Sequence, residues 1–299
     1  MRALFVLTPT ESKRLIGKAV AQLEEVKYAF KQTNLMISHG STCVYVLEEI
    51  LGKEKLLEVM NPAAYLSGII VRGTLCSTFG KEKPPIILIK KGVVTPPPPT
   101  MSEMLRDFRA DSVVIKGASA VDPEGNAGVL VSNPEGGTIG WAIGAIWARG
   151  IRLITPVGLE KLVPSVRQSV SLCGQSTFDY VQGKTAGMIP LTGAKIVTEI
   201  EALKILVGVD THLVASGGVS GSEGCVTLVS EGEKVAVKKA IKLIESFKGE
   251  ESYNFRKGIC EICIHTSPAQ PKDYSTPFTD FCQFQGKNEE ELPSYLRNR

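Results

Sequence analysis

The chain has 299 residues, of which 43% are hydrophobic and 22% are charged, and its formal net charge is +3. This composition is ordinary for a globular protein and excludes a chain that is disordered throughout. The slight positive charge does not favour nucleic acid as a partner, since no cluster of basic and aromatic residues accompanies it. The length predicts about two domains.

The sequence predicts neither a targeting segment nor a membrane partner. The apolar stretch 3–7 is too short for the core of a signal peptide, and no run approaches the roughly 20 apolar residues of a membrane helix. Seven scattered cysteines, an odd number, do not form the disulfide framework of a secreted protein. We therefore expect a cytoplasmic protein.

The chain opens with a strand over residues 3–7 and a helix that reaches about residue 31. Thr8, Pro9 and Glu11 mark the start of this helix, because they supply an N-cap, a residue suited to the first turn and the second half of a capping box. Apolar residues then recur at helical spacing.

A candidate anion-binding turn joins a strand predicted at 34–38 to a helix predicted at 43–51. It reads His39-Gly40-Ser41-Thr42. Backbone N–H groups at the start of a helix attract anions, and the two hydroxyl groups would add donors. The alternative is that Ser41 or Thr42 only caps the helix and that His39 only packs.

Residues 53–108 carry weaker patterns. They predict helices at 53–60 and 102–108, strands at 69–71 and 86–89, and a stiff spacer at the four prolines 96–99.

The central stretch 112–163 is the most informative. Its apolar and polar runs predict the order strand, loop, strand, loop, helix, strand, which is typical of an α/β core with parallel pairing. The loops of such a core lie at strand ends, where these folds bind ligands. We predict one α/β domain over 1–185, with a mainly parallel sheet flanked by helices and a loop at 173–190 as its boundary.

A second, smaller domain is predicted over 190–265. Its pattern of strand, helix, strand, strand, helix is most of a ferredoxin-like α+β unit. Residues 266–299 are rich in proline and polar residues and are expected to form an irregular tail.

Two segments carry a resemblance to a known superfamily. The turn 39–42 resembles the phosphate-binding Gly-Ser-Thr turn of ribose-5-phosphate isomerases. The segment 116–126 resembles the Gly-Ala-Asp…Asp…Gly-Asn segment of the superfamily that contains these enzymes, glucosamine-6-phosphate deaminase, translation-factor-like sugar-phosphate isomerases and CoA transferases. Residues 122–163 are similar to the LUD domain of lactate-utilisation proteins, with an ending that reads Gly158-Leu159-Glu160-Lys161-Leu162-Val163-Pro164. The resemblance covers roughly residues 10–172 and implies a site for a sugar phosphate or an acyl-CoA.

The sequence departs from this superfamily where proton transfer would need a carboxylate. Ribose-5-phosphate isomerases carry aspartates at the positions of Lys116 and Ser119. Asp122 and Glu124 are therefore the candidate catalytic residues here, although the segment 122–126 is equally a good turn sequence. A CoA transferase would need a nucleophilic glutamate, for which Glu124 and Glu135 are candidates.

A second glycine-rich turn, Gly136-Gly137-Thr138, precedes a predicted helix. It could hold an anion against backbone N–H groups, or it could only allow close packing. We predict that the segments 39–42, 116–126 and 136–140 form one pocket. The predicted ligand-binding residues are His39, Gly40, Ser41, Thr42, Lys116, Gly117, Asn126, Gly136, Gly137 and Thr138.

The leading hypothesis is thus a protein that binds a small anionic metabolite, with isomerase-like or transferase-like chemistry. The alternative is a non-catalytic module that keeps the pocket for sensing or for protein interaction. No cofactor is identified, and a homo-oligomer is left open.

The pattern Cys260-x-x-Cys263-x-His265, followed by Cys282, contains residue types that bind zinc. If residues 253–264 form a strand, however, Cys260 and Cys263 point to opposite faces and cannot share an ion. No metal ligand is therefore assigned from the sequence.

Overall fold

The computed structural model describes residues 1–78, 83–255, 257–261, 263 and 282–297. Its central element is a six-stranded sheet, in which the first four strands of the spatial order pair in parallel and the last two are joined by antiparallel pairings, β2 with β5 and β5 with β6. The order is β12 (Lys195–Val197), β10 (Arg152–Pro156), β7 (Val113–Ile115), β2 (Asn34–Ile37), β5 (Ile87–Lys90) and β6 (Val93–Thr95). The predicted α/β class with a mainly parallel sheet is confirmed.

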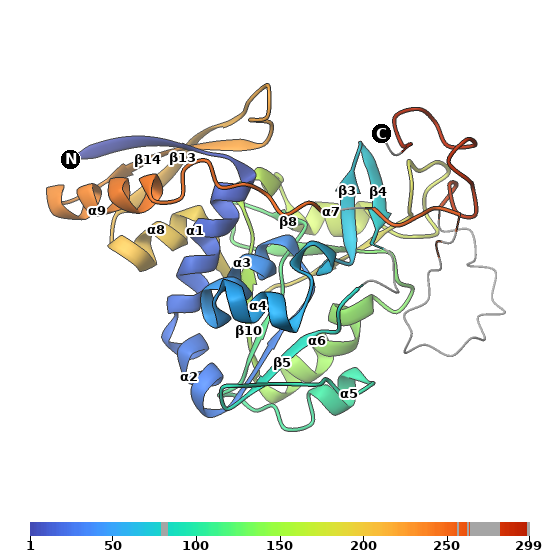
Figure 1. Ribbon diagram of the computed structural model, residues 1–299, viewed down its shortest axis with the longest axis horizontal. Helices are drawn as coiled ribbons and strands as arrows, with labels where there is room; N and C mark the ends of the chain where they lie inside the picture. Colours follow the sequence, from blue (N-terminus) through green and yellow to red (C-terminus); the bar gives the residue numbers. More distant parts are fainter. Residues whose placement is uncertain (79–82, 256, 262, 264–281, 298–299) are drawn as a thin grey trace.

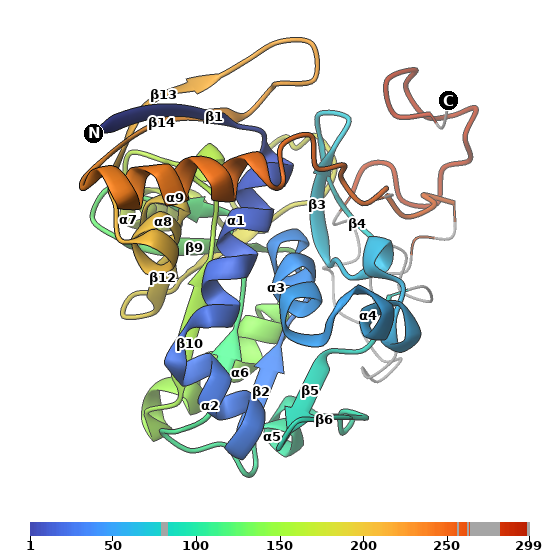
Figure 2. The ribbon, with the colours of Figure 1, turned by 60° about the vertical axis from the view of Figure 1, so that its left-hand side comes forward.

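Helices cover both faces of this sheet. Alternate residues of β2 enter different cores, because Leu35 and Ile37 pack on one side and Met36 on the other. The first side carries α1 (Pro9–Gln22), α2 (Glu24–Gln32), α3 (Ser41–Leu51) and α4 (Lys53–Val59). The second side carries α5 (Met101–Met104) and α6 (Gly137–Arg149). Figure 2 shows α1 and α3 side by side on the first side.

The predicted start of the first helix is confirmed. Thr8 accepts a hydrogen bond from the Glu11 N–H, and the Glu11 carboxylate accepts one from the Thr8 N–H, so that the capping box is complete.

A three-stranded antiparallel sheet lies beside the large one (Figure 1). Its order is β1 (Arg2–Leu7), β14 (Cys225–Glu231) and β13 (Asp210–Gly217), and it packs with α8 (Glu199–Val207) and α9 (Lys234–Glu245). Phe5 and Leu7 of β1 point into the shared core, whereas Leu4 and Val6 are exposed.

This arrangement differs from the ferredoxin-like unit predicted over 190–265. The first strand of that segment, β12, pairs with β10 in the large sheet, and the N-terminal strand β1 pairs with β14 instead. The sequence pattern predicts the local helices and strands but not which strands pair with one another. The division into domains at about 185–190 stays a prediction, and strand pairings cross it.

Smaller elements complete the described chain. They are β8 (Ala120–Val121), β9 (Ala127–Val131) and β11 (Gly187–Pro190) in one antiparallel sheet, the hairpin of β3 (Gly68–Val71) and β4 (Thr74–Ser77), the short helices η1 (Pro62–Ala64) and η2 (Leu159–Lys161), and α7 (Val166–Leu172). β11 lies inside the segment predicted as loop at 173–190. No helix of the described residues combines the length and the apolar character needed to cross a membrane.

The predicted irregular tail lies partly outside the described residues, since 264–281 and 298–299 are not among them. Its described part, 282–297, lies near the β3–β4 hairpin in both views (Figures 1 and 2). The strand expected at 253–264 is not found in the described part of that range.

Candidate functional site

The carboxyl ends of the four parallel strands meet at one edge of the large sheet. The register aligns the last residues of β2 and β7, Ile37 with Ile115, and places Ile154 of β10 beside the latter. Such an edge is where open α/β sheets bind ligands. We call the residues at this edge the strand-end site: Lys13, His39, Gly40, Ser41, Thr42, Cys43, Lys116, Gly117, Glu160, Lys161 and Glu199.

The N-terminus of α3 forms the centre of the strand-end site. α3 begins at Ser41, four residues after the end of β2, and no side chain in the described part of the chain caps it. The N–H of Gly40 donates a hydrogen bond to the Tyr65 carbonyl at 3.1 Å. The following N–H groups and the helix dipole are therefore available to an anion.

Two glycines border this helix start and leave room beside it. A Cβ added at Gly40 would lie 3.4 Å from the Cys43 sulfur, and one added at Gly117 would lie 3.7 Å from the Pro156 carbonyl and 3.8 Å from the same sulfur. The Gly117 distances are ordinary contacts and the Gly40 one is barely tighter. Packing within the protein therefore does not demand glycine at either position.

Lysine side chains gather around the helix start. Lys116 follows β7 and its Nζ donates to the Gly117 carbonyl at 3.1 Å, while Lys161 ends η2 and its Nζ donates to the Ala118 carbonyl at 3.2 Å. Burial lowers the pKa of Lys116, and the positive charge of Lys161 lowers it further. Burial and Lys161 act in the same direction on the pKa of Lys13. Like charges held this close favour an anion among them.

His39 is a buried neutral imidazole at this edge. Its Nε2 donates to the Pro84 carbonyl at 2.7 Å, and its ring packs on Tyr65 with a centroid distance of 4.7 Å. Burial, together with Lys83 and Lys116, lowers the pKa of His39 to about 3. The second ring nitrogen, Nδ1, is buried without a hydrogen-bond partner among the described residues. It can accept a hydrogen bond from a ligand hydroxyl group.

Two glutamates lie together next to the lysines. Glu199, at the start of α8, is fully buried and accepts a hydrogen bond from the Leu159 N–H at 2.9 Å. The Glu160 carboxylate folds back over Gly158, where an added Cβ would lie 1.8 Å from its Oε2. Burial, with the charge of Glu160, raises the pKa of Glu199 to about 7. Glu160 Oε2 has no partner among the described residues, whereas the Ser12 hydroxyl is a hydrogen-bond partner of Glu199 and acts to lower its pKa. A raised pKa in such a pair is typical of acid–base sites.

Asp122, predicted as catalytic, is engaged with the backbone instead. Its side chain is buried and accepts hydrogen bonds from the N–H groups of Asn126 and Val166, both at 2.9 Å, and from the Asn126 side chain at 3.3 Å. Burial acts to raise the pKa of Asp122, but these hydrogen bonds outweigh it and lower the pKa. The carboxylate thus joins the turn 122–126 to the start of α7, and Asn126 serves the same turn. Glu124 is exposed in that turn.

The glycines of the second glycine-rich turn, 136–140, are explained by packing within the protein. Gly136 has a φ of +77°, and a Cβ there would lie 2.6 Å from Ile189 Cδ1; a Cβ at Gly140 would lie 2.1 Å from the Glu135 carbonyl oxygen. These glycines are required by packing. No hydrogen bond or ion pair among the described residues joins Gly137 or Thr138 to the strand-end site, so their place in a single pocket stays a prediction.

The structure thus brings together the predicted segments 39–42 and 116–117, and it adds residues that sequence reasoning missed. The added residues are Lys13, Cys43, Glu160, Lys161 and Glu199. Glu160 and Lys161 follow a predicted strand directly, and this position was the available signal. The burial of Glu199 depends on long-range packing and left no signal in the sequence.

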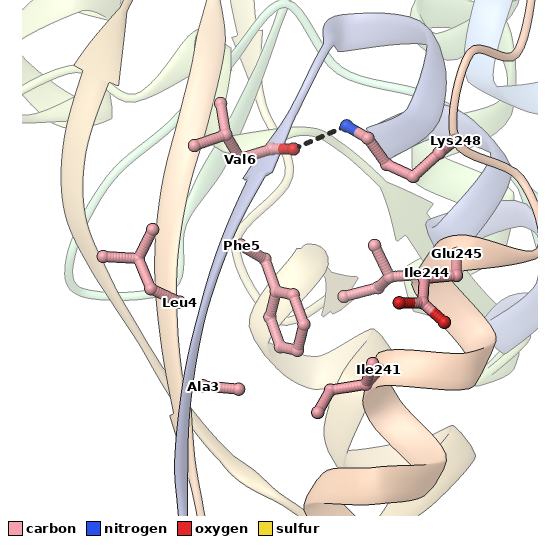
Figure 3. A pocket seen from close by; sticks show the side chains of 8 residues that line it. All are labelled: Ala3, Leu4, Phe5, Val6, Ile241, Ile244, Glu245 and Lys248. Atoms are coloured by element: carbon pink, nitrogen blue, oxygen red, sulfur yellow. Dashed lines mark hydrogen bonds between the residues drawn. The ribbon is translucent and has the colours of Figure 1, made fainter.

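A pocket of about 330 Å³ lies elsewhere, between β1 and α9 (Figure 3). Its lining is mostly apolar, and its lysine, Lys248, already donates to the Val6 carbonyl and to Glu11. This pocket offers few free polar groups to a metabolite.

The candidate metal ligands fall only partly within the described residues, since His265 lies outside them. No group of three or more His, Cys, Asp or Glu side chains in the described part of the chain is arranged to hold a metal ion.

Comparison with known proteins gives little. No protein-family model matches this chain, and no curated protein matches it. A solved structure of D-ribose-5-phosphate isomerase in complex with phospho-erythronic acid is 15% identical, over 77% of this chain and 86% of that chain, with a TM-score of 0.25. This likeness is too distant to assign the chain to a family, so that the geometry of the strand-end site is the basis for any functional conclusion.

Proposed function

We propose that this protein binds a small phosphorylated metabolite of the sugar-phosphate class at the strand-end site. One observation carries the proposal: lysines with lowered pKa values converge beside an uncapped helix N-terminus at the carboxyl edge of a parallel sheet. The anionic group would lie on the N–H groups of Ser41 and Thr42, with Lys116 and Lys161 as counter-charges.

The remaining polar groups favour a hydroxylated ligand over a bare anion. The unpartnered Nδ1 of His39 is a neutral acceptor, which suits a hydroxyl donor and not a phosphate oxygen. Leaving such a buried nitrogen unpaired costs about 1–3 kcal/mol, which a ligand hydroxyl would recover.

The chemistry that fits this arrangement is isomerase-like proton transfer. Glu160 is largely buried yet next to the lysines, and it is the candidate to take a proton from a carbon beside a carbonyl group and return it to the neighbouring carbon. Glu199 is fully buried, so that it acts as a positioning residue through Leu159 and Glu160. This assignment replaces the earlier hypothesis that Asp122 and Glu124 are the carboxylates of catalysis.

Calorimetric titration tests the binding step. A pentose 5-phosphate should bind more tightly than inorganic phosphate, because only the sugar offers hydroxyl groups to His39. Acetyl-CoA, titrated in parallel, distinguishes the acyl-CoA class. Binding of none of the three to folded protein would contradict the proposal.

Solvent hydrogen exchange tests the chemistry separately. In deuterated water the wild-type protein should exchange the carbon-bound proton beside the carbonyl group of a bound sugar phosphate, and Glu160→Gln should not. Binding without exchange would favour the non-catalytic sensing module over the enzyme.

A further inference from the structure

Three segments that are far apart in the sequence meet beside the β3–β4 hairpin. The N–H of Gly258 donates to the Ser77 carbonyl at 2.9 Å, and the N–H of Gly286 donates to the Cys260 carbonyl at 2.8 Å. A β-bridge joins Lys184 to Cys282. Figures 1 and 2 show the C-terminal segment near this hairpin. Backbone hydrogen bonds thus fix the neighbourhood of 74–77, of the described residues 257–261 and 263, and of 282–286.

Each of these segments brings cysteine to the same place. The four are Cys76 in β4, Cys260 and Cys263, and Cys282. Cys282 packs against a small buried cluster that contains Cys260 and Phe284. The hydrogen bond from the Gly286 N–H to the Cys260 carbonyl places the segment that begins at Cys282 beside Cys260. The hydrogen bond from Gly258 to Ser77, the residue after Cys76, places Cys76 beside the segment that carries Cys260.

Cys260 and Cys263 do not lie in a strand. The N–H of Cys263 donates to the Cys260 carbonyl at 3.2 Å, a hydrogen bond of the kind that closes a turn. In a strand the two sulfurs would lie on opposite faces, but a turn lets both face one side. The geometric objection to shared ligation, which the sequence pattern raised, is therefore removed.

Two buried lysines lie beside the thiols. Lys184 is 6% exposed; its backbone pairs with Cys282 in a β-bridge, and its N–H donates at 2.9 Å to the carbonyl of Leu75, the residue before Cys76. The Lys257 side chain is 4% exposed, and its Nζ lies 3.9 Å from the Cys260 sulfur. A zinc ion bound by four thiolates has a net charge of about −2, which nearby ammonium groups stabilise, although Lys257 also lies 3.9 Å from the Glu289 carboxylate.

We propose that Cys76, Cys260, Cys263 and Cys282 bind one zinc ion with tetrahedral geometry. The four thiols must turn toward a common centre when the ion binds, because the described side chains are not arranged around one. Each thiol loses its proton to solvent as its sulfur coordinates the ion. The ion then joins the C-terminal segment to the β3–β4 hairpin.

A single ion suits this place better than an iron–sulfur cluster. Cys260, Phe284, Leu292 and Leu296 are packed together with almost no exposure. A cluster would need room for inorganic sulfur atoms among them, whereas zinc needs only the four protein sulfurs.

Cobalt reconstitution of the full-length wild-type protein tests the proposal without any variant. Under reducing conditions, one Co²⁺ per chain should bind and give the intense sulfur-to-metal absorption of a tetrahedral four-thiolate site, and one Zn²⁺ should displace it. A folded protein that binds no Co²⁺ in this way, or a spectrum of fewer than four sulfur ligands, would overturn the proposal. Purified protein that contains iron and acid-labile sulfide would also overturn it.

Single variants then identify the ligands by metal content. Cys76→Ser is the sharpest, because this residue lies in the hairpin, far in sequence from the Cys-x-x-Cys turn. It should reduce zinc affinity by a factor of 10 or more, as should Cys282→Ser. Cys173→Ser, at a half-buried cysteine of another segment, is the matched control and should retain zinc. Equal loss in the control, or full retention in Cys76→Ser, would contradict the assignment.

Discussion

The strand-end site and the turn 122–126 are both rich in polar residues and glycine, yet they differ in what their polar atoms do. In the turn, Asp122 accepts several hydrogen bonds from the protein itself. At the strand-end site, His39 Nδ1 and Glu160 Oε2 are buried without a partner among the described residues. Buried polar groups that are hydrogen-bonded within the protein stabilise the fold, whereas buried polar groups without a hydrogen bond can bind a ligand.

The glycines separate the two kinds of region in the same way. Gly136 cannot accept a side chain without collision, while Gly117 can. A glycine that packing does not require leaves space for something else. The comparison therefore predicts that substitutions at the strand-end site affect ligand binding. Substitutions in the turn 122–126 and in the segment 136–140 should affect stability.

The largest expected effect is on ligand affinity. Lys116→Met should weaken binding of a pentose 5-phosphate roughly 10–100-fold, since it removes a buried charge-assisted contact. Titration calorimetry measures the change. Lys90→Met is the control, because Lys90 is partly exposed and paired with Asp107. Equal affinities of Lys116→Met and wild type would remove the anion site from this edge.

Two glycine substitutions should separate stability from binding. Gly136→Ala should lower the free energy of unfolding by about 1–3 kcal/mol, because alanine is strained at a φ of +77° and its Cβ would collide with Ile189. Gly117→Ala should change it by no more than about 0.5 kcal/mol, yet it should weaken ligand binding. Urea unfolding and calorimetry measure the two quantities. The reverse pattern would invert the roles assigned to these loops.

Removing the Asp122 carboxylate should cost stability and spare binding. Asp122→Ala leaves the N–H groups of Val166 and Asn126 without an acceptor, which should lower the free energy of unfolding by about 1–3 kcal/mol. Glu124→Ala, in the exposed part of the turn, is the matched control and should change it by at most about 0.5 kcal/mol. A loss of ligand affinity at unchanged stability in Asp122→Ala would restore its catalytic candidacy.

The last expected effect is a pH dependence of stability from Glu199. The pKa of this group is about 7 in the folded protein and 4.5 ordinarily, so that the folded state holds the proton more tightly between these values. Its stabilising contribution is complete below about pH 4.5 and is lost as the pH rises toward 7. Glu199→Gln should flatten the fall in melting temperature between about pH 5 and about pH 8. An identical pH profile in this variant would show that Glu199 does not titrate there.

The local content of the fold could be predicted from the sequence. The capping box of Thr8 and Glu11 and the apolar runs of β2, β7 and β10 have signals within a few residues. The pairing of β12 with β10, and of β1 with β14, could not, because partners are chosen by core packing and not by the strands' own patterns.

Part of the candidate site could likewise be predicted from the sequence, and part depends on tertiary packing. The turn 39–42 and the pair Lys116 and Gly117 follow strands, and parallel strands end at one edge, so their proximity follows from the fold class. The buried partnership of Glu160 with Glu199 joins two different strand ends through tertiary packing. Asp122 had the right residue type for catalysis, but only the structure reveals that its oxygens are already engaged.

The pairing of β1 with β14 also sets the order in which the chain can complete its fold. Residues 2–7 find their partners at 226–231, so the small sheet cannot close until the ribosome has made most of the chain. Until then β1 is an unpaired strand with apolar side chains on both faces, which is prone to associate with other chains. A fragment that ends at residue 185 would keep β1 in this state permanently. We therefore expect such a fragment to aggregate on expression and to regain solubility when residues 190–255 are supplied as a second chain.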